Sequence, residues 1–357
     1  MSRGHRVGVA LAAIALGSSL IVTGCSDDKA VAPIAPKDYA VYFGDGAIKN
    51  WYFEYHPLTN RVDSFYVPFQ AWSGIDASAD GTRLFIGGTA SIAVVDLDSK
   101  TIVEELPYKG AVVVSPDNRW LAVTGDDLYI LRASDYSVIF HDTTKTGWGG
   151  AFTPHGERFF CPAFDTVGFQ NRILRVDIEN GFAMSVTDFP EERVGQIIPS
   201  PDEILWFIYL NPGYCSSEFR AYMPSADSTL AEGYLEAGKG GIAISPDGRC
   251  VFYTGPGPWI INGPYICSPP VPEFYVYDVQ ANVTGVIGTT GIIEDSLSTE
   301  LYMGDLAITP DGCWLVAVEG SGRDVVVAYD MTTLKLSKYA RLGGVRQFHS
   351  LTCQKMP

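Results

Sequence analysis

The stretch GIAISPDGRCVFYTG, residues 241–255, contains the pattern that decides the fold. Apolar residues alternate with small or polar ones on both sides of Ser245-Pro246-Asp247-Gly248, which is typical of two antiparallel strands joined by a tight turn. Proline fixes φ, aspartate accepts hydrogen bonds from the following amides, and glycine adopts positive φ. The stretch therefore predicts a β-hairpin.

The same phrase recurs five more times along the chain. The other copies are GIDASADGTRLFIGG (74–88), GAVVVSPDNRWLAVTG (110–125), GAFTPHGERFFCPA (150–163), GQIIPSPDEILWFIY (195–209) and GDLAITPDGCWLVAVEG (304–320). The turn position falls at Asp80, Asp117, His155, Asp202, Asp247 and Asp311, with spacings of 37, 38, 47, 45 and 64 residues. These spacings are near the roughly 40–50 residues of a propeller blade. A third strand that often ends in aspartate follows each hairpin, as in SIAVVDLDSK (91–100), and a fourth comes after it, so each repeat predicts a four-stranded blade.

The two ends of the chain together supply a seventh repeat. Residues 39–68 contain a second, third and fourth strand without a first, and residues 345–357 supply one first strand. We therefore expect an all-β, seven-bladed β-propeller of four-stranded antiparallel blades, closed by pairing of the N- and C-terminal segments. The expected blades are 345–357 with 39–69, then 70–108, 109–146, 147–190, 191–237, 238–290 and 291–344.

The Ser-Pro-Asp-Gly turns and the third strands ending in Val-x-Asp or Tyr-Asp resemble those of the bacterial YVTN/lactonase-like seven-bladed propellers. The resemblance covers nearly all of residues 39–357. It implies the fold and leaves the activity open, because that group includes surface proteins, binding scaffolds and some enzymes. The repeats lack the Trp-Asp and Gly-His signatures of WD40 repeats.

The N-terminus has the pattern of an export signal. Arg3 and Arg6 precede an apolar run at residues 7–16, and Val22-Thr23-Gly24-Cys25 resembles the bacterial lipoprotein box. The resemblance implies a signal peptide over 1–24 and a diacylglycerol on Cys25, followed by a flexible tether to residue 37 and the propeller over 38–357. Ser26 after the cysteine favours the outer membrane of the cell envelope. The alternative is an ordinary signal peptide that happens to contain a cysteine.

Composition limits the classes of partner. Hydrophobic residues make up 46% of the chain, which excludes a disordered acidic chain. The 41 acidic residues outnumber 25 basic ones, so a nucleic-acid partner is not expected. A closed ring leaves no sheet edge to pair with other chains, so a monomer is expected, with the membrane contacted through the lipid on Cys25.

Long loops are expected on the face opposite the Pro-Asp-Gly turns, where they form one raised rim. A protein or glycan ligand is the expected partner there. The candidate binding residues, in these loops or at the mouth of the channel, are Trp72, Trp148, Phe164, Tyr214, Trp259 and Tyr265. The alternative is that these aromatic side chains pack within their own loops. Acidic residues of the same face, among them Asp126 and Asp127, could hold a cation, although aspartate is common in turns for backbone reasons.

A competing hypothesis is an enzyme, either a lactonase-like hydrolase or an oxidoreductase, with its site at the channel mouth. His349 and Asp305, from adjacent blades, are the one His/Asp pair that can be built there as catalytic candidates. No nucleophile accompanies them, so we favour a structural histidine. Four histidines remain beyond residue 24, in different blades, so no metal site and no cofactor are expected. A third hypothesis is a purely structural envelope component.

Six cysteines remain besides Cys25. Cys215 and Cys267 lie in long loops of neighbouring blades, and we predict a disulfide between them that stiffens the rim. The other four fall on or beside inner strands, where buried free thiols are expected: Cys161, Cys250, Cys313 and Cys353.

Overall fold

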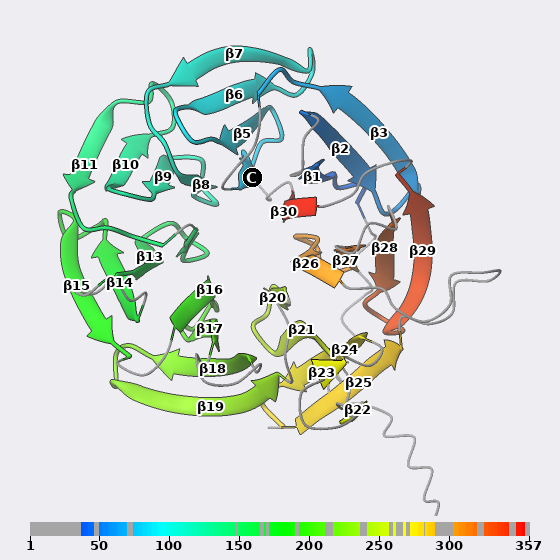
Figure 1. Cartoon of the computed structure of the whole chain (residues 1–357). Helices are drawn as coiled ribbons and strands as arrows, with labels where there is room; N and C mark the ends of the chain where they lie inside the picture. The colour runs from blue at the N-terminus through cyan, green and yellow to red at the C-terminus, as the bar shows by residue number, and fades with distance from the viewer. Residues whose placement is uncertain are drawn as a thin grey trace, which may run out of the picture.

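Seven small sheets stand around a central axis in the computed structural model of the chain (Figure 1). The structure describes residues 37–45, 50–69, 74–147, 149–164, 168, 171–189, 193–210, 217–235, 241–256, 260–261, 267–268, 272–281, 283–289, 303–319, 325–342 and 348–353. Each sheet has four antiparallel strands, so the predicted seven-bladed β-propeller is confirmed. The described residues contain no helix, and thus none long and apolar enough to cross a membrane.

Blades 1 to 4 are numbered along the chain, and their strands fall within the predicted boundaries. Blade 1 contains β30 (Phe348–Cys353), β1 (Val41–Asp45), β2 (Trp51–His56) and β3 (Arg61–Tyr66). Blade 2 contains β4 (Ile75–Ala77), β5 (Arg83–Gly87), β6 (Ile92–Asp96) and β7 (Thr101–Leu106). Blade 3 contains β8 (Ala111–Val114), β9 (Trp120–Thr124), β10 (Leu128–Arg132) and β11 (Val138–Asp142). Blade 4 contains β12 (Ala151–Phe152), β13 (Arg158–Ala163), β14 (Arg172–Asp177) and β15 (Ala183–Asp188).

Blades 5 to 7 follow the same order, and one of them carries an insertion. Blade 5 contains β16 (Arg193–Pro199), β17 (Leu205–Leu210), β18 (Ser217–Met223) and β19 (Ser228–Leu235). Blade 6 contains β20 (Ile242–Ile244), β21 (Cys250–Pro256), β24 (Pro272–Asp278) and β25 (Val283–Thr289). A two-stranded hairpin of β22 (Ile260–Ile261) and β23 (Cys267–Ser268) is inserted between β21 and β24. Blade 7 contains β26 (Met303–Ile308), β27 (Trp314–Glu319), β28 (Val325–Asp330) and β29 (Lys335–Arg341).

The ring closes through blade 1, where the two ends of the chain meet. The C-terminal β30 is the innermost strand and pairs with β1, with Val41 opposite Cys353 and Gly44 opposite His349. Figure 1 shows this red strand beside the blue strands of the N-terminal half of the blade. The predicted closure by the N- and C-terminal segments is therefore confirmed.

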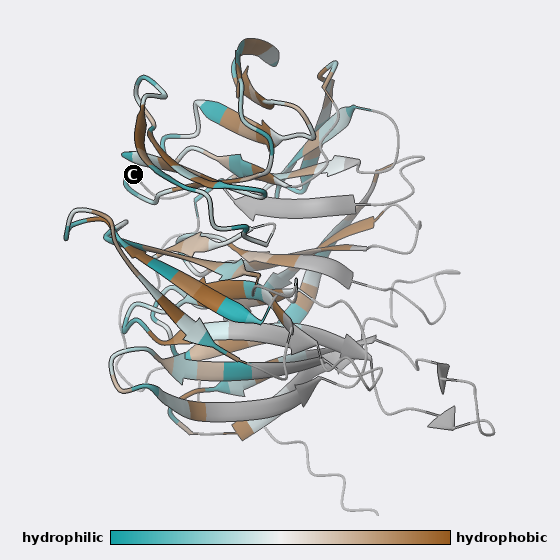
Figure 2. Ribbon diagram, turned by 60° about the vertical axis from the view of Figure 1, so that its left-hand side comes forward, coloured by the Kyte–Doolittle hydropathy of each residue, from teal (hydrophilic) through white to brown (hydrophobic). Residues whose placement is uncertain are grey.

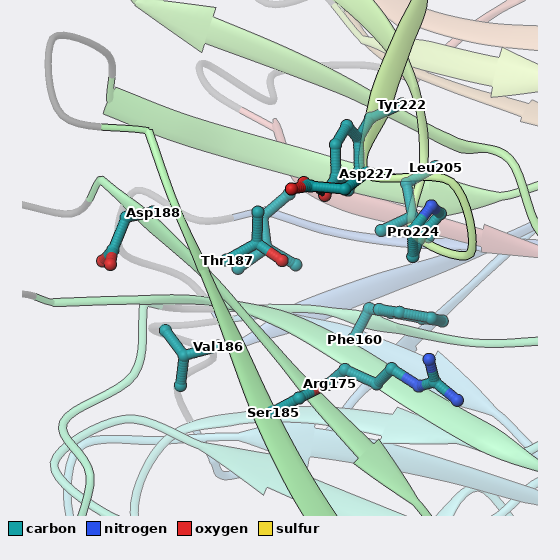
Figure 3. A pocket seen from close by; sticks show the side chains of 11 residues that line it. Phe160, Arg175, Ser185, Val186, Thr187, Asp188, Leu205, Tyr222, Pro224 and Asp227 are labelled. Carbon is teal, nitrogen blue, oxygen red and sulfur yellow. Dashed lines mark hydrogen bonds between the residues drawn. The ribbon is translucent and has the colours of Figure 1, made fainter.

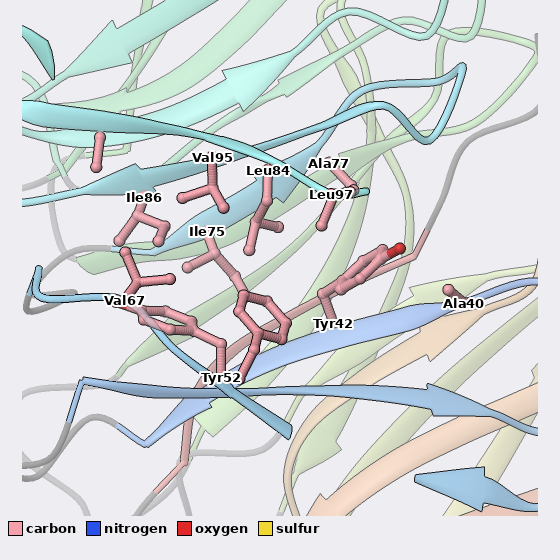
Figure 4. Packing of buried hydrophobic residues seen from close by; sticks show 12 residues of the cluster. Ala40, Tyr42, Tyr52, Val67, Ile75, Ala77, Leu84, Ile86, Val95 and Leu97 are labelled. Atoms are coloured by element: carbon pink, nitrogen blue, oxygen red, sulfur yellow. The ribbon is translucent and has the colours of Figure 1, made fainter. Parts of the chain in front are cut away.

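The hydrophobic core is divided among the spaces between neighbouring blades. The middle strands are covered on both faces, so β5 and β6 are almost continuously buried, whereas the outermost β7 is mostly exposed. Between blades 1 and 2, Tyr42 and Tyr52 pack against Ile75, Leu84 and other apolar side chains of blade 2 (Figure 4). Brown, hydrophobic stretches recur on many of the coloured strands in Figure 2.

Repeated side-chain hydrogen bonds fix the turns between first and second strands. In blade 3 the Ser115 hydroxyl donates to Asp117 (2.6 Å), which also accepts from the Arg119 amide, while the Trp120 amide donates to Ser115 (2.9 Å). The same contacts recur at three other turns, in the pairs Ser78/Asp80, Ser245/Asp247 and Thr309/Asp311. These aspartates have the structural role expected from the sequence. We call this end of the ring the turn face.

Neighbouring turns also contact one another on the turn face. The Ala79 amide donates to the Asn118 side chain of the next blade (2.7 Å), and a Cβ on Gly156 would lie 3.0 Å from Asp117. Lys37, the first described residue, lies on this face, because its amide donates to the Asp311 carboxylate (3.0 Å). The turn face is therefore where the N-terminal segment joins the ring.

The opposite end, which we call the loop face, carries the links between blades and the connections from second to third strands. Gly110 in the link between blades 2 and 3 has φ +142°, and a Cβ there would lie 2.1 Å from the Thr124 carbonyl oxygen. Only glycine allows the link to pass this close to the next blade.

Deleting residues 345–357 removes β30 and opens the ring. Because β1 then loses its inner partner and blade 1 its innermost strand, we expect no soluble folded protein. Circular dichroism and thermal unfolding of the purified variant measure this. A truncated chain that melts like the full-length protein contradicts the closure.

Candidate functional site

Most of the sequence-predicted site residues lie outside the described part of the chain. These are Cys25, Trp72, Trp148, Tyr214, Cys215, Trp259 and Tyr265. Asp305 and His349 lie on β26 and β30, the innermost strands of the adjacent blades 7 and 1, as expected. The side chains of these two residues and of Cys267 are outside the description, so their contacts stay predictions.

Phe164 is the one predicted binding aromatic whose side chain the structure describes. It is half-buried, its amide donates to the Lys145 carbonyl oxygen (3.0 Å), and the Lys145 ammonium lies 5.0 Å from its ring centroid. This contact joins the loop after β13 to the link between blades 3 and 4.

Two polar side chains of the innermost strands join neighbouring blades. The Gln196 amide on β16 exchanges two hydrogen bonds with the Ile242 backbone of blade 6, at 3.3 and 3.2 Å. The buried Asp76 carboxylate on β4 accepts from the Val114 amide of blade 3 (2.7 Å). Both side chains have a structural role at the channel wall.

The loop face of blade 3 brings together three aromatic rings, which we call the blade-3 cluster: Tyr108, Tyr129 and His141. Tyr129 and His141 are cross-strand partners on β10 and β11, and their rings stack at 4.3 Å with parallel planes. Tyr108, from the end of blade 2, tilts against Tyr129 at 4.9 Å. Cross-strand ring pairs of this kind stabilise a sheet and present a flat edge to solvent.

A carboxylate binds two members of the cluster. The Tyr129 hydroxyl donates to Asp127 Oδ2 (3.0 Å), and His141 Nε2 lies 3.3 Å from the same oxygen. Burial, together with this hydrogen bond, raises the pKa of Tyr129. The side chains of Asp127 and His141 are 35% and 42% exposed, so an incoming ligand reaches both.

An ion pair borders the cluster. Lys109 contacts Asp126, and this hydrogen bond raises the pKa of the lysine and lowers that of the aspartate. The arrangement offers a ring surface, an acceptor carboxylate and basic groups, which suits binding of a glycan or a peptide side chain.

Sequence reasoning placed Asp126 and Asp127 on this face but did not connect them with the rings. The register that puts Tyr129 opposite His141 is set by the short turn at residues 133–137 between β10 and β11. Tyr108 required knowledge of how the link from blade 2 passes over blade 3.

One group of described residues has the composition of a metal site. Glu54, His56 and Asp63 each bring a possible ligand atom within 4.8 Å of the others. Basic side chains already occupy the two carboxylates: Lys100 contacts Glu54, and Arg61 lies 2.9 Å from Asp63. We interpret the group as an ion-pair network on the turn face that joins blade 1 to Lys100 of blade 2.

The Glu54 carboxylate is the titrating centre of this network. Burial on its own would raise its pKa, but hydrogen bonds from His56 and Lys100 and the charge of the lysine lower it to about 2. Its stabilising contribution is complete above its ordinary pKa of 4.5 and is lost as the pH falls toward 2.

Glu54→Gln should lower the free energy of unfolding at pH 7 by about 1–3 kcal/mol. It should also flatten the loss of stability below about pH 5, because the variant has no carboxylate to protonate. Urea unfolding at several pH values measures both effects. Asp63→Asn, at a half-exposed ion pair, is the control and should cost about 0.5 kcal/mol or less; equal behaviour of the two variants contradicts the assignment.

The cysteines agree only in part with expectation. Cys161 and Cys313 are free thiols, and burial raises the pKa of both. Cys250 is buried as expected but is disulfide-bonded, so the expectation of a free thiol there is wrong. Burial says only that a thiol is shielded, whereas bond formation depends on a second Cβ within about 4 Å, which strand position does not reveal. The Cys215–Cys267 pair stays a prediction.

Comparisons with known proteins support the fold alone. No protein family model matches the chain, and no curated protein sequence matches it significantly. A functionally unknown protein from Desulfotomaculum acetoxidans is similar in structure, with a TM-score of 0.63 and 11% identity over 90% of this chain and 100% of that one. The dihydro-heme d1 dehydrogenase NirN in complex with DHE gives a TM-score of 0.56 and 15% identity over 89% and 76% of the two chains. The propeller domain of Cps50 (Swd1) from Myceliophteria thermophila gives 0.58 and 10% over 78% and 89%.

The fold and these likenesses define the chain as a seven-bladed β-propeller with a WD40-like architecture. The similar structures include a dehydrogenase and a protein of unknown function, so the shared fold does not choose between binding and catalysis.

Proposed function

We propose that the protein is a lipid-anchored binding protein of the bacterial cell envelope whose ligand, a protein or a glycan, binds on the loop face. The observation that carries the proposal is the point where the chain enters the ring. The Lys37 amide donates to Asp311, and His56 Nδ1 lies 3.3 Å from Asp38, both on the turn face. A tether that ends at residue 37 therefore attaches to the face opposite the blade-3 cluster.

This attachment orients the propeller. A lipid on Cys25 would hold the turn face toward the membrane, outer membrane being favoured, and turn the loop face away from it. The turn face is also occupied by the repeated Ser-Asp contacts, so its polar groups are already satisfied. The loop face has the exposed carboxylate and imidazole of the blade-3 cluster.

The chemistry of the blade-3 cluster favours binding. Its carboxylate is shared between a phenol and an imidazole at 3.0 and 3.3 Å, and ring surfaces lie beside it. Aromatic rings next to a few directed polar groups are characteristic of recognition surfaces. The competing enzyme hypothesis depends on His349 and Asp305, whose side chains lie outside the described part of the chain.

Lipidation of Cys25 has a direct test. Cells expressing the protein and supplied with an alkyne-tagged palmitate should label the wild type and leave Cys25→Ser unlabelled, with the variant moving to the soluble fraction. Acyl chains supply the membrane affinity, about 0.8 kcal/mol per buried methylene. Cys161→Ser is the control and should stay labelled. Label retained by Cys25→Ser would falsify the anchoring.

The binding face is tested with the soluble mature chain carrying Cys25→Ser. Immobilised wild type and variants are exposed to envelope extract of the source organism, and captured proteins and glycans are quantified by mass spectrometry. Tyr129→Ala and Asp127→Asn should each reduce capture of the ligand at least about fivefold, as for central interface residues. Removing residues 256–270 tests the inserted hairpin of blade 6 in the same assay.

Asp135→Asn is the matched control for Asp127→Asn. Asp135 belongs to the same blade, is 53% exposed, and lies at the opposite end in the turn between β10 and β11. It should leave capture unchanged. Equal losses in Asp127→Asn and Asp135→Asn, or no loss in either, contradict a ligand at the blade-3 cluster.

A further inference from the structure

Neighbouring blades pack against one another at seven interfaces. At six of these interfaces an apolar side chain from the same turn of the repeat is packed between the two blades. That turn joins the third and fourth strands of the second blade. The side chains are Leu58 in blade 1, Leu97 in blade 2, Tyr136 in blade 3, Phe182 in blade 4, Val279 in blade 6 and Leu334 in blade 7.

Blade 5 departs from this rule. Its turn consists of residues 224–227, and Asp227 (φ 46°) holds the position that Leu334 (φ 51°) holds in blade 7. The apolar cluster between blades 4 and 5 receives no described side chain from this turn. A cavity of about 410 Å³ lies there instead, lined by Pro224 and Asp227 on the blade-5 side (Figure 3).

The walls of the cavity come from both blades. Buried Phe160 and Ile173 of blade 4 and Leu205 of blade 5 lie at the floor of the cavity, and the more accessible apolar lining comes from Val186 of blade 4 and Pro224 of blade 5. The polar groups are Arg175, Ser185, Thr187, Asp188, Tyr222 and Asp227. A volume of this size, with apolar walls and a few polar groups, falls in the roughly 300–1,000 Å³ range of small-molecule sites.

The charges around the cavity select the kind of ligand. Arg175 Nη2 lies 3.1 Å from Asp177, a single contact that leaves other guanidinium N–H groups of Arg175 able to donate, and Asp188 is paired with Arg172 at 2.6 Å. Asp227 accepts a hydrogen bond from the Tyr222 hydroxyl (2.5 Å) and has no basic partner among the described side chains. An anion would meet Asp227 and a cation would meet Arg175, whereas a neutral molecule with several hydroxyl groups can donate to one and accept from the other.

We propose that the cavity between blades 4 and 5 is a binding site for a neutral sugar residue. The accessible apolar side chains of Val186 and Pro224 pack against the ring carbons of the sugar. Its hydroxyl groups donate to Asp227 and accept from Arg175. The site lies between blades 4 and 5, and the proposal does not depend on the function proposed above.

Saturation-transfer NMR on the full mature chain tests the proposal. The probes are D-glucose, D-galactose and N-acetyl-D-glucosamine as neutral sugars, with glucosamine as the cation and glucuronate as the anion. At least one neutral sugar should receive saturation, and its charged analogues should receive less. No transfer to any neutral sugar, or stronger transfer to a charged one, overturns the proposal.

Asp227→Leu places the site at the cavity, because it restores the side chain that blade 7 carries at this position. It should weaken sugar binding at least tenfold, as expected when a charged hydrogen-bond acceptor is lost and the cavity is filled. Asn60→Leu makes the same change at the corresponding turn of blade 1 (φ 56°), where Leu58 already packs between the two blades, and should leave binding unchanged.

A second variant protects the test against a folding failure. Ser185→Phe adds bulk at the cavity from an exposed position of the outermost strand β15, where surface substitutions cost little stability. It should also weaken binding at least tenfold. Unchanged binding in folded Asp227→Leu or in Ser185→Phe means that the sugar binds elsewhere, and the cavity is then only an incompletely filled contact between blades.

Discussion

The pairing of β30 with β1 is the interaction on which the rest of the structure depends. Each blade is apolar on both faces of its middle strands, so each needs a neighbour on either side. In an open chain of seven blades the first and last would each leave one such face in water. Five residue pairs between the two terminal strands complete blade 1 and thereby cover both faces. The core is a property of the ring and not of any single blade.

The turn face and the loop face of the closed ring differ in what their polar side chains do. On the turn face, serine or threonine hydroxyls and aspartates hold each hairpin, and contacts such as Ala79 to Asn118 join neighbouring turns. The ion-pair network around Glu54 belongs to this same side. The polar groups that hold these turns are already hydrogen-bonded to one another, which is why we propose ligand binding on the loop face and where a blade departs from the repeat.

The polar clusters and the cavity described above lie where a blade departs from the repeat. Blade 3 carries Tyr129, His141 and Asp127 where its hairpins meet the loop face, and Asp127 contacts both of the ring side chains. Blade 5 carries Pro224 and Asp227 where six other blades supply an apolar side chain, which leaves a lined cavity. A repeat protein keeps its fold while single repeats vary, because each unit packs only against its neighbours.

The sequence by itself determined the hairpins, the strand order and the closing blade, because alternation of apolar residues and turn chemistry act over a few neighbouring residues. It also placed Asp126 and Asp127 on the correct face. It did not reveal the stacking of Tyr108 on Tyr129, the contact of Lys100 with Glu54 across 46 positions, or the bonded state of Cys250. Nor did it show that the turn at Asp227 faces the cavity between blades 4 and 5. Only the tertiary structure decided these, since each depends on how segments that are distant in the sequence approach one another in space.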